Sequence, residues 1–141
     1  MTAGDAQMWN RVLTLHAHVE HRVGAALQRR HGLGLSEYRA LGHLAAAPRS
    51  ELRMQELSDL LGLNQSSVTR LVGRLNAADF TYRDLCPDDK RGVYTVINEA
   101  GRERYGEARS TYEQTLTAAL DEAAEGDPET AKAVAALRGA L

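Results

Sequence analysis

The sequence predicts a mainly α-helical fold that carries one small β-hairpin. Long proline-free stretches near both ends place apolar residues at helical spacing, and two short amphipathic segments flank Gly62 in the middle of the chain. Two runs of aromatic and β-branched residues follow, joined by a charged turn that contains a proline. At 141 residues the chain has the length of one domain with a modest core.

The first predicted helix extends from Asp5 to about His31. Apolar side chains recur along it at helical spacing, and Gly32-Leu33-Gly34 ends the pattern. The apolar positions are Val12, Leu15, Val19, Val23 and Leu27.

Two short helices are predicted within Met54 to Leu75. In the first, Leu57, Leu60 and Leu61 share one face, which we expect to be buried. Gly62 suits the left-handed end of that helix, and Asn64 can cap the next one through its side-chain oxygen. The second helix then buries a stripe made of Val68, Leu71, Val72 and Leu75. This layout predicts a helix-turn-helix corner.

The outward face of the second helix is polar and partly basic. Arginine can neutralise phosphates or pair with guanine edges, and hydroxyl and amide groups can bind phosphates or bases. We therefore predict DNA contacts by Gln65, Ser66, Ser67, Thr69, Arg70 and Arg74. Gly73 on this face either permits close approach to DNA or is a tolerated substitution. The alternative for the whole segment is an ordinary helical hairpin with a solvated polar face.

A β-hairpin is predicted after this corner. Its strands are Phe80 to Arg83 and Val93 to Ile97, and the turn from Cys86 to Gly92 carries a proline, two aspartates and a glycine. Lys90 and Arg91 at its tip are placed to reach phosphates or the minor groove, and Asp89 is expected to orient Arg91. The alternative is a solvated turn. With the hairpin as a wing, the predicted fold is a winged helix-turn-helix.

The C-terminal part predicts two more helices. Glu99 to Glu125 is a long helical stretch that Gly126 ends, and Asp127-Pro128-Glu129 begins a last helix. The apolar stripes of the long terminal helices are larger than their own chain can cover, so we expect a second copy of the chain to bury them in a homodimer. The alternative is a monomer in which these helices pack back onto the same chain. The stripes contain Tyr105, Tyr112, Leu116, Leu120 and Ala123, then Val134, Leu137 and Leu141.

Charge and composition exclude several classes of protein. The net charge is −2, but residues 64–92 carry five basic against four acidic residues and residues 99–141 carry five against nine. This uneven distribution of charge suits a protein that places one face on DNA and keeps another face away from it. We expect a cytoplasmic protein without a membrane span or signal peptide, without a bound metal or other cofactor, and without enzymatic activity. The histidines are not spaced as metal ligands.

Two features invite regulation by small molecules or redox chemistry. Trp9, His16 and Tyr38 are candidates for binding an aromatic ligand, although each is also an ordinary packing or solvated residue. Cys86 is the single cysteine, so an intramolecular disulfide is excluded. It is either a reactive thiol beside Arg83 or an inert one.

The chain resembles the MarR family of bacterial transcriptional regulators over nearly its whole length. The residues that carry the resemblance are Leu35-Ser36-Glu37-Tyr38 before a helix through Leu41 and Leu44, then Glu56-Leu57, Ser67 to Val72, Arg74-Leu75, Asp89-Lys90-Arg91 and Val96 to Gly101. Two positions depart from the family pattern: Asn98 replaces a threonine, and Asp79 replaces a common glycine after the recognition helix. Ser58 is a small residue at a position where helix-turn-helix motifs often have alanine. Asn98 still suits a helix cap, whereas Asp79 is less suited than glycine to left-handed geometry.

The resemblance implies one MarR-like domain over residues 1–141. Residues 1–34 and 99–141 would form the dimerisation helices, and residues 35–98 the DNA-binding lobe. It implies a homodimer on a pseudo-palindromic double-stranded DNA operator, released by a small aromatic ligand or by thiol oxidation. The alternatives are a redox-responsive regulator that uses Cys86, a winged-helix module that binds a protein instead of DNA, and a small-molecule carrier.

Overall fold

The computed structural model describes residues 3–85 and 93–140, and these form two compact units. The first, the terminal unit, contains Met1–Gly32 and Ser110–Leu141, and the second, the central unit, contains Leu33–Arg109. The division falls inside the long helix α5 (Glu99–Gly126), so the first part of that helix belongs to the central unit. Each unit is described by itself.

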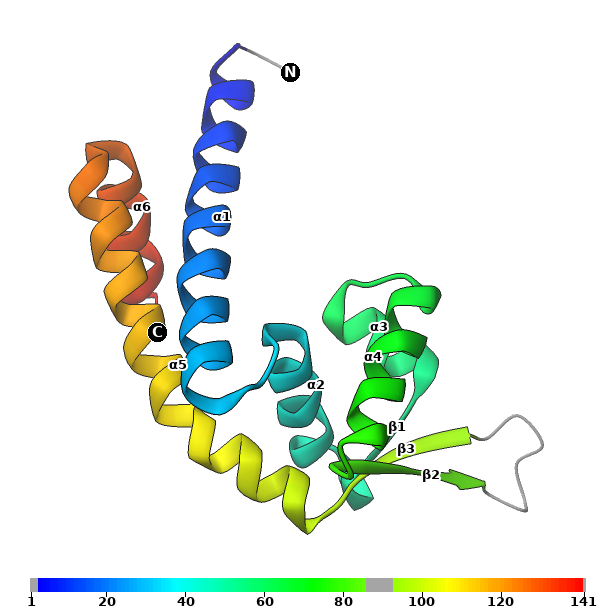
Figure 1. Cartoon of the computed structure of the whole chain (residues 1–141). Helices are drawn as coiled ribbons and strands as arrows, with labels where there is room; N and C mark the ends of the chain where they lie inside the picture. Colours follow the sequence, from blue (N-terminus) through cyan, green and yellow to red (C-terminus); the bar gives the residue numbers. More distant parts are fainter. Residues whose placement is uncertain (1–2, 86–92, 141) are drawn as a thin grey trace. The chain divides into compact units, whose positions relative to one another are not determined.

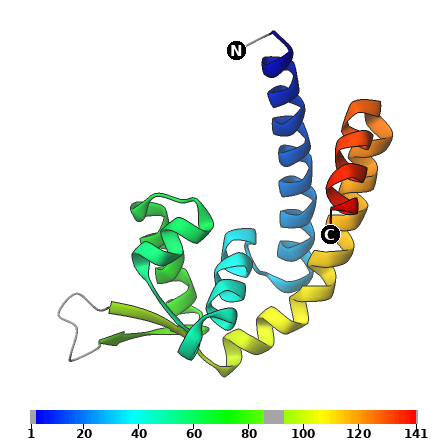
Figure 2. The same cartoon turned by 180° about the vertical axis from the view of Figure 1, so that it is seen from behind.

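The terminal unit is built from helix α1 (Ala3–His31), the second part of α5, and helix α6 (Pro128–Gly139). Figures 1 and 2 show these segments side by side from opposite directions. Ion pairs join them: Arg22 binds Glu122 at 2.9 Å, and Arg138 binds Asp121 at 2.9 Å. Between the helices lies a small core that contains Val23, Ala26, Leu27, Ala119 and Val134.

The predicted ends of these helices are largely confirmed. Helix α1 ends at His31, and α6 begins at Pro128, directly after Asp127. Asp127 accepts a hydrogen bond from the Thr130 hydroxyl at 2.8 Å, and this bond, with the nearby Arg11, lowers the pKa of the Asp127 carboxyl. Asp127 therefore joins the start of α6 to α1, because Arg11 Nε lies 3.1 Å from its carboxylate.

Glu122 makes the terminal unit sensitive to acid. Hydrogen bonds from Arg22 and then from His18 lower the pKa of Glu122 from 4.5 to about 2. A group whose pKa is depressed in the folded protein contributes stability above its unfolded pKa and loses it as the pH falls through the folded pKa. We expect Glu122→Gln to lower the melting temperature at pH 7, and this difference to shrink between pH 4.5 and 2. Thermal melts across this range test it, with exposed Glu107→Gln on the same helix as control.

Besides the first part of α5, the central unit contains three shorter α-helices and a small sheet. Helix α2 (Leu35–Ala46) is followed by the short 3-10 turn η1 (Pro48–Ser50), and the chain then continues into α3 (Met54–Leu61) and α4 (Gln65–Ala77). The antiparallel sheet has the order β1-β3-β2, from β1 (Glu51–Arg53), β2 (Thr81–Leu85) and β3 (Val93–Ile97). The core of the central unit includes Leu33, Leu41, Leu44, Leu57, Val68, Leu71 and Leu75.

Three details of the central unit differ from the sequence-based expectations. Strand β1 was not predicted: its three residues pair with β3, with Leu52 opposite Thr95. Strand β2 begins at Thr81 and ends at Leu85, later than the expected Phe80 to Arg83. The expectation that Leu60 is buried is wrong, because its side chain is 53% exposed while Leu57 of the same helix is fully buried. A helix of only eight residues has room for a narrow buried stripe, and Ser58 takes a place in it.

The junction between α4, the sheet and α5 uses the two residues that depart from the family pattern. Asp79 adopts a φ of 60°, so it takes the left-handed conformation in which glycine is common. The Asn98 side-chain amide donates a hydrogen bond from Nδ2 to the Asp79 backbone carbonyl at 2.6 Å. The Oδ1 atom of the same side chain accepts a hydrogen bond from the Gly101 N–H at 2.8 Å. Asn98 therefore caps α5 as predicted and also holds the turn that Asp79 forms.

Candidate nucleic-acid interface

The corner between α3 and α4 fixes the direction of α4. Asn64 Oδ1 accepts hydrogen bonds from the Ser67 N–H and from the Ser66 hydroxyl, both at 2.9 Å, which confirms the predicted cap. Gly62 has a φ of 67°, the left-handed conformation predicted for it. The Ser58 hydroxyl donates to the Leu63 carbonyl at 2.5 Å, so the small side chain at this position satisfies a backbone group of the turn.

Helix α4 buries its apolar stripe and presents its polar face outward. The stripe Val68, Leu71, Val72 and Leu75 is buried as expected. Within the polar face, the Thr69 hydroxyl donates to the Gln65 carbonyl at 2.9 Å, and the Gln65 amide donates to Gln55 at 3.2 Å. The structure brings the six predicted α4 residues to one accessible surface: Gln65, Ser66, Thr69, Arg70 and Arg74 are exposed, and Ser67 is half-buried.

The two arginines of this surface have different surroundings. Arg70 is exposed, and its Nη2 lies 3.5 Å from the Ser67 hydroxyl, which is a long contact. Arg74 is held by an ion pair in which its Nε donates to Glu37 Oε1 of α2 at 3.2 Å. The Arg70 guanidinium is therefore available to a ligand, whereas that of Arg74 has a fixed partner on one edge.

The described part of the hairpin supplies further groups beside α4. Arg83 on β2 is exposed, and on the neighbouring strand the Tyr94 hydroxyl accepts a hydrogen bond from Arg53 Nε at 3.0 Å. The guanidinium carbon of Arg53 also lies 5.1 Å from the centre of the Tyr94 ring. The predicted tip residues Cys86, Asp89, Lys90 and Arg91 lie outside the described residues, so their roles stay predictions.

A hollow of about 420 Å³ lies between α4 and the sheet, and Gly73 lines it. A Cβ atom at Gly73 would meet no atom within 4 Å, so the packing of the described residues does not require glycine there. The other lining residues are Met54, Thr69, Val72, Asn76, Arg83, Val93 and Thr95.

Replacing Gly73 by alanine therefore separates stability from function. Alanine favours a helix interior by about 1 kcal/mol over glycine, so we expect Gly73→Ala to raise the free energy of unfolding by about that amount. Urea denaturation measures this change. If glycine serves close approach to DNA, the stabilised variant binds DNA more weakly than the wild-type protein; unchanged DNA affinity would identify the glycine as a tolerated substitution.

The three candidates for ligand binding are distributed over both units. Trp9 and His16 are exposed residues of α1, and His16 lies 3.8 Å from Glu20. Tyr38 in the central unit is buried and stacks on Tyr105, with ring centres 4.8 Å apart. The structure therefore shows Tyr38 engaged with another aromatic ring, and the ligand role of all three stays a prediction.

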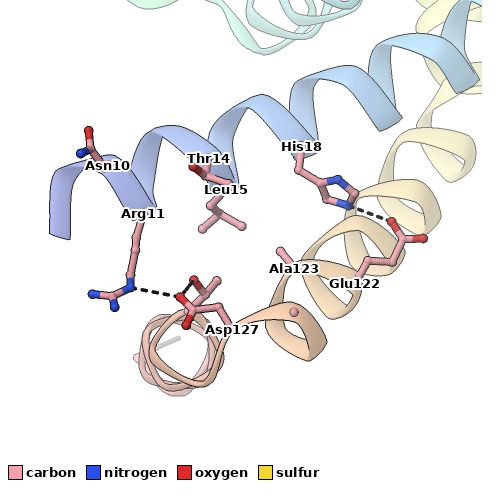
Figure 3. Close-up of a pocket in the computed structure, with 10 residues that line it drawn as sticks. Asn10, Arg11, Thr14, Leu15, His18, Glu122, Ala123 and Asp127 are labelled. Atoms are coloured by element: carbon pink, nitrogen blue, oxygen red, sulfur yellow. Dashed lines mark hydrogen bonds and ion pairs between the residues drawn. The ribbon is translucent and has the colours of Figure 1, made fainter. Parts of the chain in front are cut away.

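The terminal unit contains a pocket of about 400 Å³ that none of these three residues lines. Figure 3 shows Leu15 of α1 between the ion pair of Arg11 with Asp127 and the hydrogen bond of His18 with Glu122. The volume is within the range of about 300 to 1,000 Å³ typical of small-molecule sites. Sequence reasoning did not identify this pocket, because its two walls lie more than 100 positions apart along the chain.

The described residues show neither a metal-binding cluster nor a membrane-spanning helix. In that part of the chain, no group of three or more His, Cys, Asp or Glu side chains is arranged to hold a metal ion. None of the helices formed by residues 3–85 and 93–140 is both long and apolar enough to cross a membrane.

A capped helix-turn-helix corner with an exposed basic helix, followed by an antiparallel hairpin, defines a winged helix-turn-helix protein. Residues 31–92 match the model of the MarR family. The structure superposes on a MarR family transcriptional regulator from Streptomyces coelicolor, Sco3205, solved in complex with DNA, with 26% identity, a TM-score of 0.80, and coverage of 98% of this chain and 88% of that one. A MarR family transcriptional regulator from Silicibacter pomeroyi gives 28% identity, a TM-score of 0.73, and coverage of 98% and 93%.

The regulator AbsC from Streptomyces coelicolor shares the fold at 21% identity and a TM-score of 0.77, with coverage of 99% and 97%. A comparison with proteins of curated function finds no match. These matches agree with the resemblance that the sequence motifs indicated: residues 31–92 match the MarR family model, and over nearly its whole length the chain is similar to MarR family transcriptional regulators.

Proposed function

We propose that the protein is a homodimer that binds a pseudo-palindromic DNA operator through α4 and the wing, and that a small aromatic ligand releases it. The observation that carries the DNA-binding part is the exposed face of α4, where two arginines and several hydroxyl groups lie opposite a buried apolar stripe. Such a face supplies both phosphate contacts and hydrogen-bond donors for base edges. The similarity to Sco3205, which was solved in complex with DNA, supports the same function.

A gel shift tests DNA binding. The probe is duplex DNA from upstream of the protein's own gene, and an unrelated duplex of equal length is the competitor. We expect a specific complex whose affinity falls steeply as salt rises, because each neutralised phosphate releases counterions. Absence of a specific complex at low salt would contradict the proposal. A protein partner that competes for the α4 face, without any DNA affinity, would instead identify a protein-interaction module.

The dimer is supported by apolar side chains that the terminal unit leaves exposed. On α1, Trp9 is 56% and Leu13 is 49% exposed, and on α6 Leu137 is 69% exposed. Of the expected stripes, Val12 on α1 is 40% exposed and Leu137 on α6 is 69% exposed, whereas Trp9 and Leu13 lie outside them. Burial of apolar surface is the main favourable term in subunit association, so a second copy of the chain is the natural cover.

A charge placed on this surface is expected to separate the subunits. Leu13→Glu would bury an unpaired carboxylate in the interface, so we expect the mass measured by light scattering to fall from dimer to monomer. Gln28→Glu adds the same charge at an exposed position near the other end of α1 and serves as the control. A wild-type protein that elutes as a monomer at micromolar concentration would refute the dimer.

The ligand is proposed to be a small aromatic acid, and the single tryptophan of the chain offers a direct readout. If Trp9 contacts such a ligand, titration with aromatic acids quenches its fluorescence and weakens the DNA complex over the same concentration range. Quenching that leaves DNA affinity unchanged would identify a carrier and not a regulated repressor. Oxidation of Cys86 as an alternative trigger is tested by the variant Cys86→Ser, which would lose any response to peroxide.

A further inference from the structure

The ion pair between α2 and α4 joins Arg74, a predicted DNA contact, to Glu37, which lies outside the predicted DNA-contact set. Glu37 belongs to the first turn of α2, and it is fixed by two bonds. Its Oε2 accepts a hydrogen bond from the Gly34 N–H at 3.3 Å, and its Oε1 accepts one from Arg74 Nε at 3.2 Å. A Cβ atom at Gly34 would lie 3.3 Å from Oε1, so glycine leaves space for the carboxylate to fold back.

This arrangement holds the Arg74 guanidinium in one direction. The Glu37 side chain is 21% exposed, whereas that of Arg74 is 56% exposed. The ion pair uses Nε, so the two terminal nitrogens of Arg74 can still donate to further acceptors. An arginine whose orientation is already restricted loses less side-chain entropy when it binds a ligand.

A polar hollow of about 290 Å³ lies beside this arginine, on the flank of α4 that faces α2. Two arginines and two serines line it, and Leu63 and Leu71 form its apolar wall. Arg70 and Ser67 are themselves in contact there, with Arg70 Nη2 3.5 Å from Ser67 Oγ. The lining residues are Ser36, Leu63, Ser67, Arg70, Leu71 and Arg74.

A fixed guanidinium group with hydroxyl-bearing side chains beside it, here Arg74 with Ser36 and Ser67, is the kind of arrangement that binds phosphate oxygens. We propose that this hollow takes one backbone phosphate of the bound DNA, that Ser36 of α2 contributes to it, and that Glu37 is the positioning residue that directs Arg74 into it. The inference rests on the proposed DNA binding and adds α2 to the contact surface. Arg74 then contributes affinity that is independent of base sequence.

The test depends on whether removal of the Glu37 carboxylate raises or lowers DNA affinity. If Glu37 only added negative charge near DNA, its removal would raise affinity. If it positions Arg74, Glu37→Ala lowers affinity, and we expect a loss of about threefold to tenfold on the operator duplex and on an unrelated duplex alike. Glu37→Gln keeps an oxygen acceptor for Arg74 Nε, so its loss is expected to be smaller.

Arg74→Ala should reduce affinity by about tenfold on both duplexes. The plot of log affinity against log salt should also become less steep by about 0.9, the value for one phosphate contact. In the Arg74→Ala background, Glu37→Ala should cause no further loss. Ser36→Ala should weaken both complexes by equal factors without changing the salt slope, because a hydroxyl releases no counterion.

Glu56→Ala is the matched control. Glu56 has the same position in α3 that Glu37 has in α2, since its carboxylate accepts a hydrogen bond from the Arg53 N–H at 3.0 Å. An equal loss of affinity in Glu37→Ala and Glu56→Ala would show that the loss comes from removing a helix cap, and it would overturn the inference. It is also overturned if Glu37→Ala raises affinity, or if Arg74→Ala weakens only the operator complex at unchanged salt slope. A wild-type protein that binds neither duplex would refute the proposed function itself.

Discussion

Arg70→Ala is expected to remove most of the discrimination between operator and unrelated DNA. Arg70 is exposed at the centre of the outward face of α4, and its one contact with the described residues is the long one to Ser67. A bidentate contact from arginine to a guanine edge is worth about 1 to 3 kcal/mol of discrimination, so a loss of about tenfold to 100-fold on the operator is expected. Fluorescence anisotropy with operator and unrelated duplexes at constant salt measures the change.

Two further variants serve as controls for the Arg70→Ala measurement. Arg70→Lys keeps the charge and loses the planar fork, so it should retain the affinity for unrelated DNA and lose the preference for the operator. Arg29→Ala removes the same charge from an exposed position of the terminal unit and should leave the preference intact. Unchanged operator affinity in Arg70→Ala would argue against α4 as the helix that reads bases.

The second large effect concerns Gly101, which is buried at the start of α5. A Cβ atom there would lie 2.4 Å from the backbone oxygen of Phe80 and 2.8 Å from the Ile97 side chain. The Phe80 oxygen cannot move freely, because it accepts a hydrogen bond from the Asn98 N–H at 3.1 Å. We expect Gly101→Ala to lower the free energy of unfolding by about 3 kcal/mol, the upper part of the usual range for overpacking.

The same substitution elsewhere in α5 should have the opposite sign. Gly106 is exposed in this helix, and a Cβ atom there would meet no atom within 4 Å. Gly106→Ala is therefore expected to raise the free energy of unfolding by about 1 kcal/mol, since alanine is the better helix former. Urea denaturation of both variants measures the difference, and a Gly101→Ala protein as stable as the wild type would show that the junction of Phe80 and α5 adjusts without cost.

Local patterns in the sequence were sufficient for the elements that depend on neighbouring residues. The periodic stripe Val68, Leu71, Val72 and Leu75, the left-handed Gly62 and the Asn64 cap all involve atoms a few positions apart, so the corner and the outward face of α4 were predictable. The pattern could not predict strand β1, because three residues carry no periodicity and Leu52 becomes a strand residue only by pairing with β3. Leu60 was misjudged because periodicity identifies a face, not how much of it a neighbour covers.

By itself the sequence determined the order of helices and hairpin, the buried stripe of α4 and the candidate DNA contacts on it. The tertiary structure alone decided that Glu37 holds Arg74, that Ser36 joins Arg70 at one hollow, and that Arg22 and His18 share Glu122. These contacts join residues between 34 and 104 positions apart. Side-chain spacing along one element predicts which residues share a face, whereas only the packing of separate helices brings such distant groups within hydrogen-bonding distance.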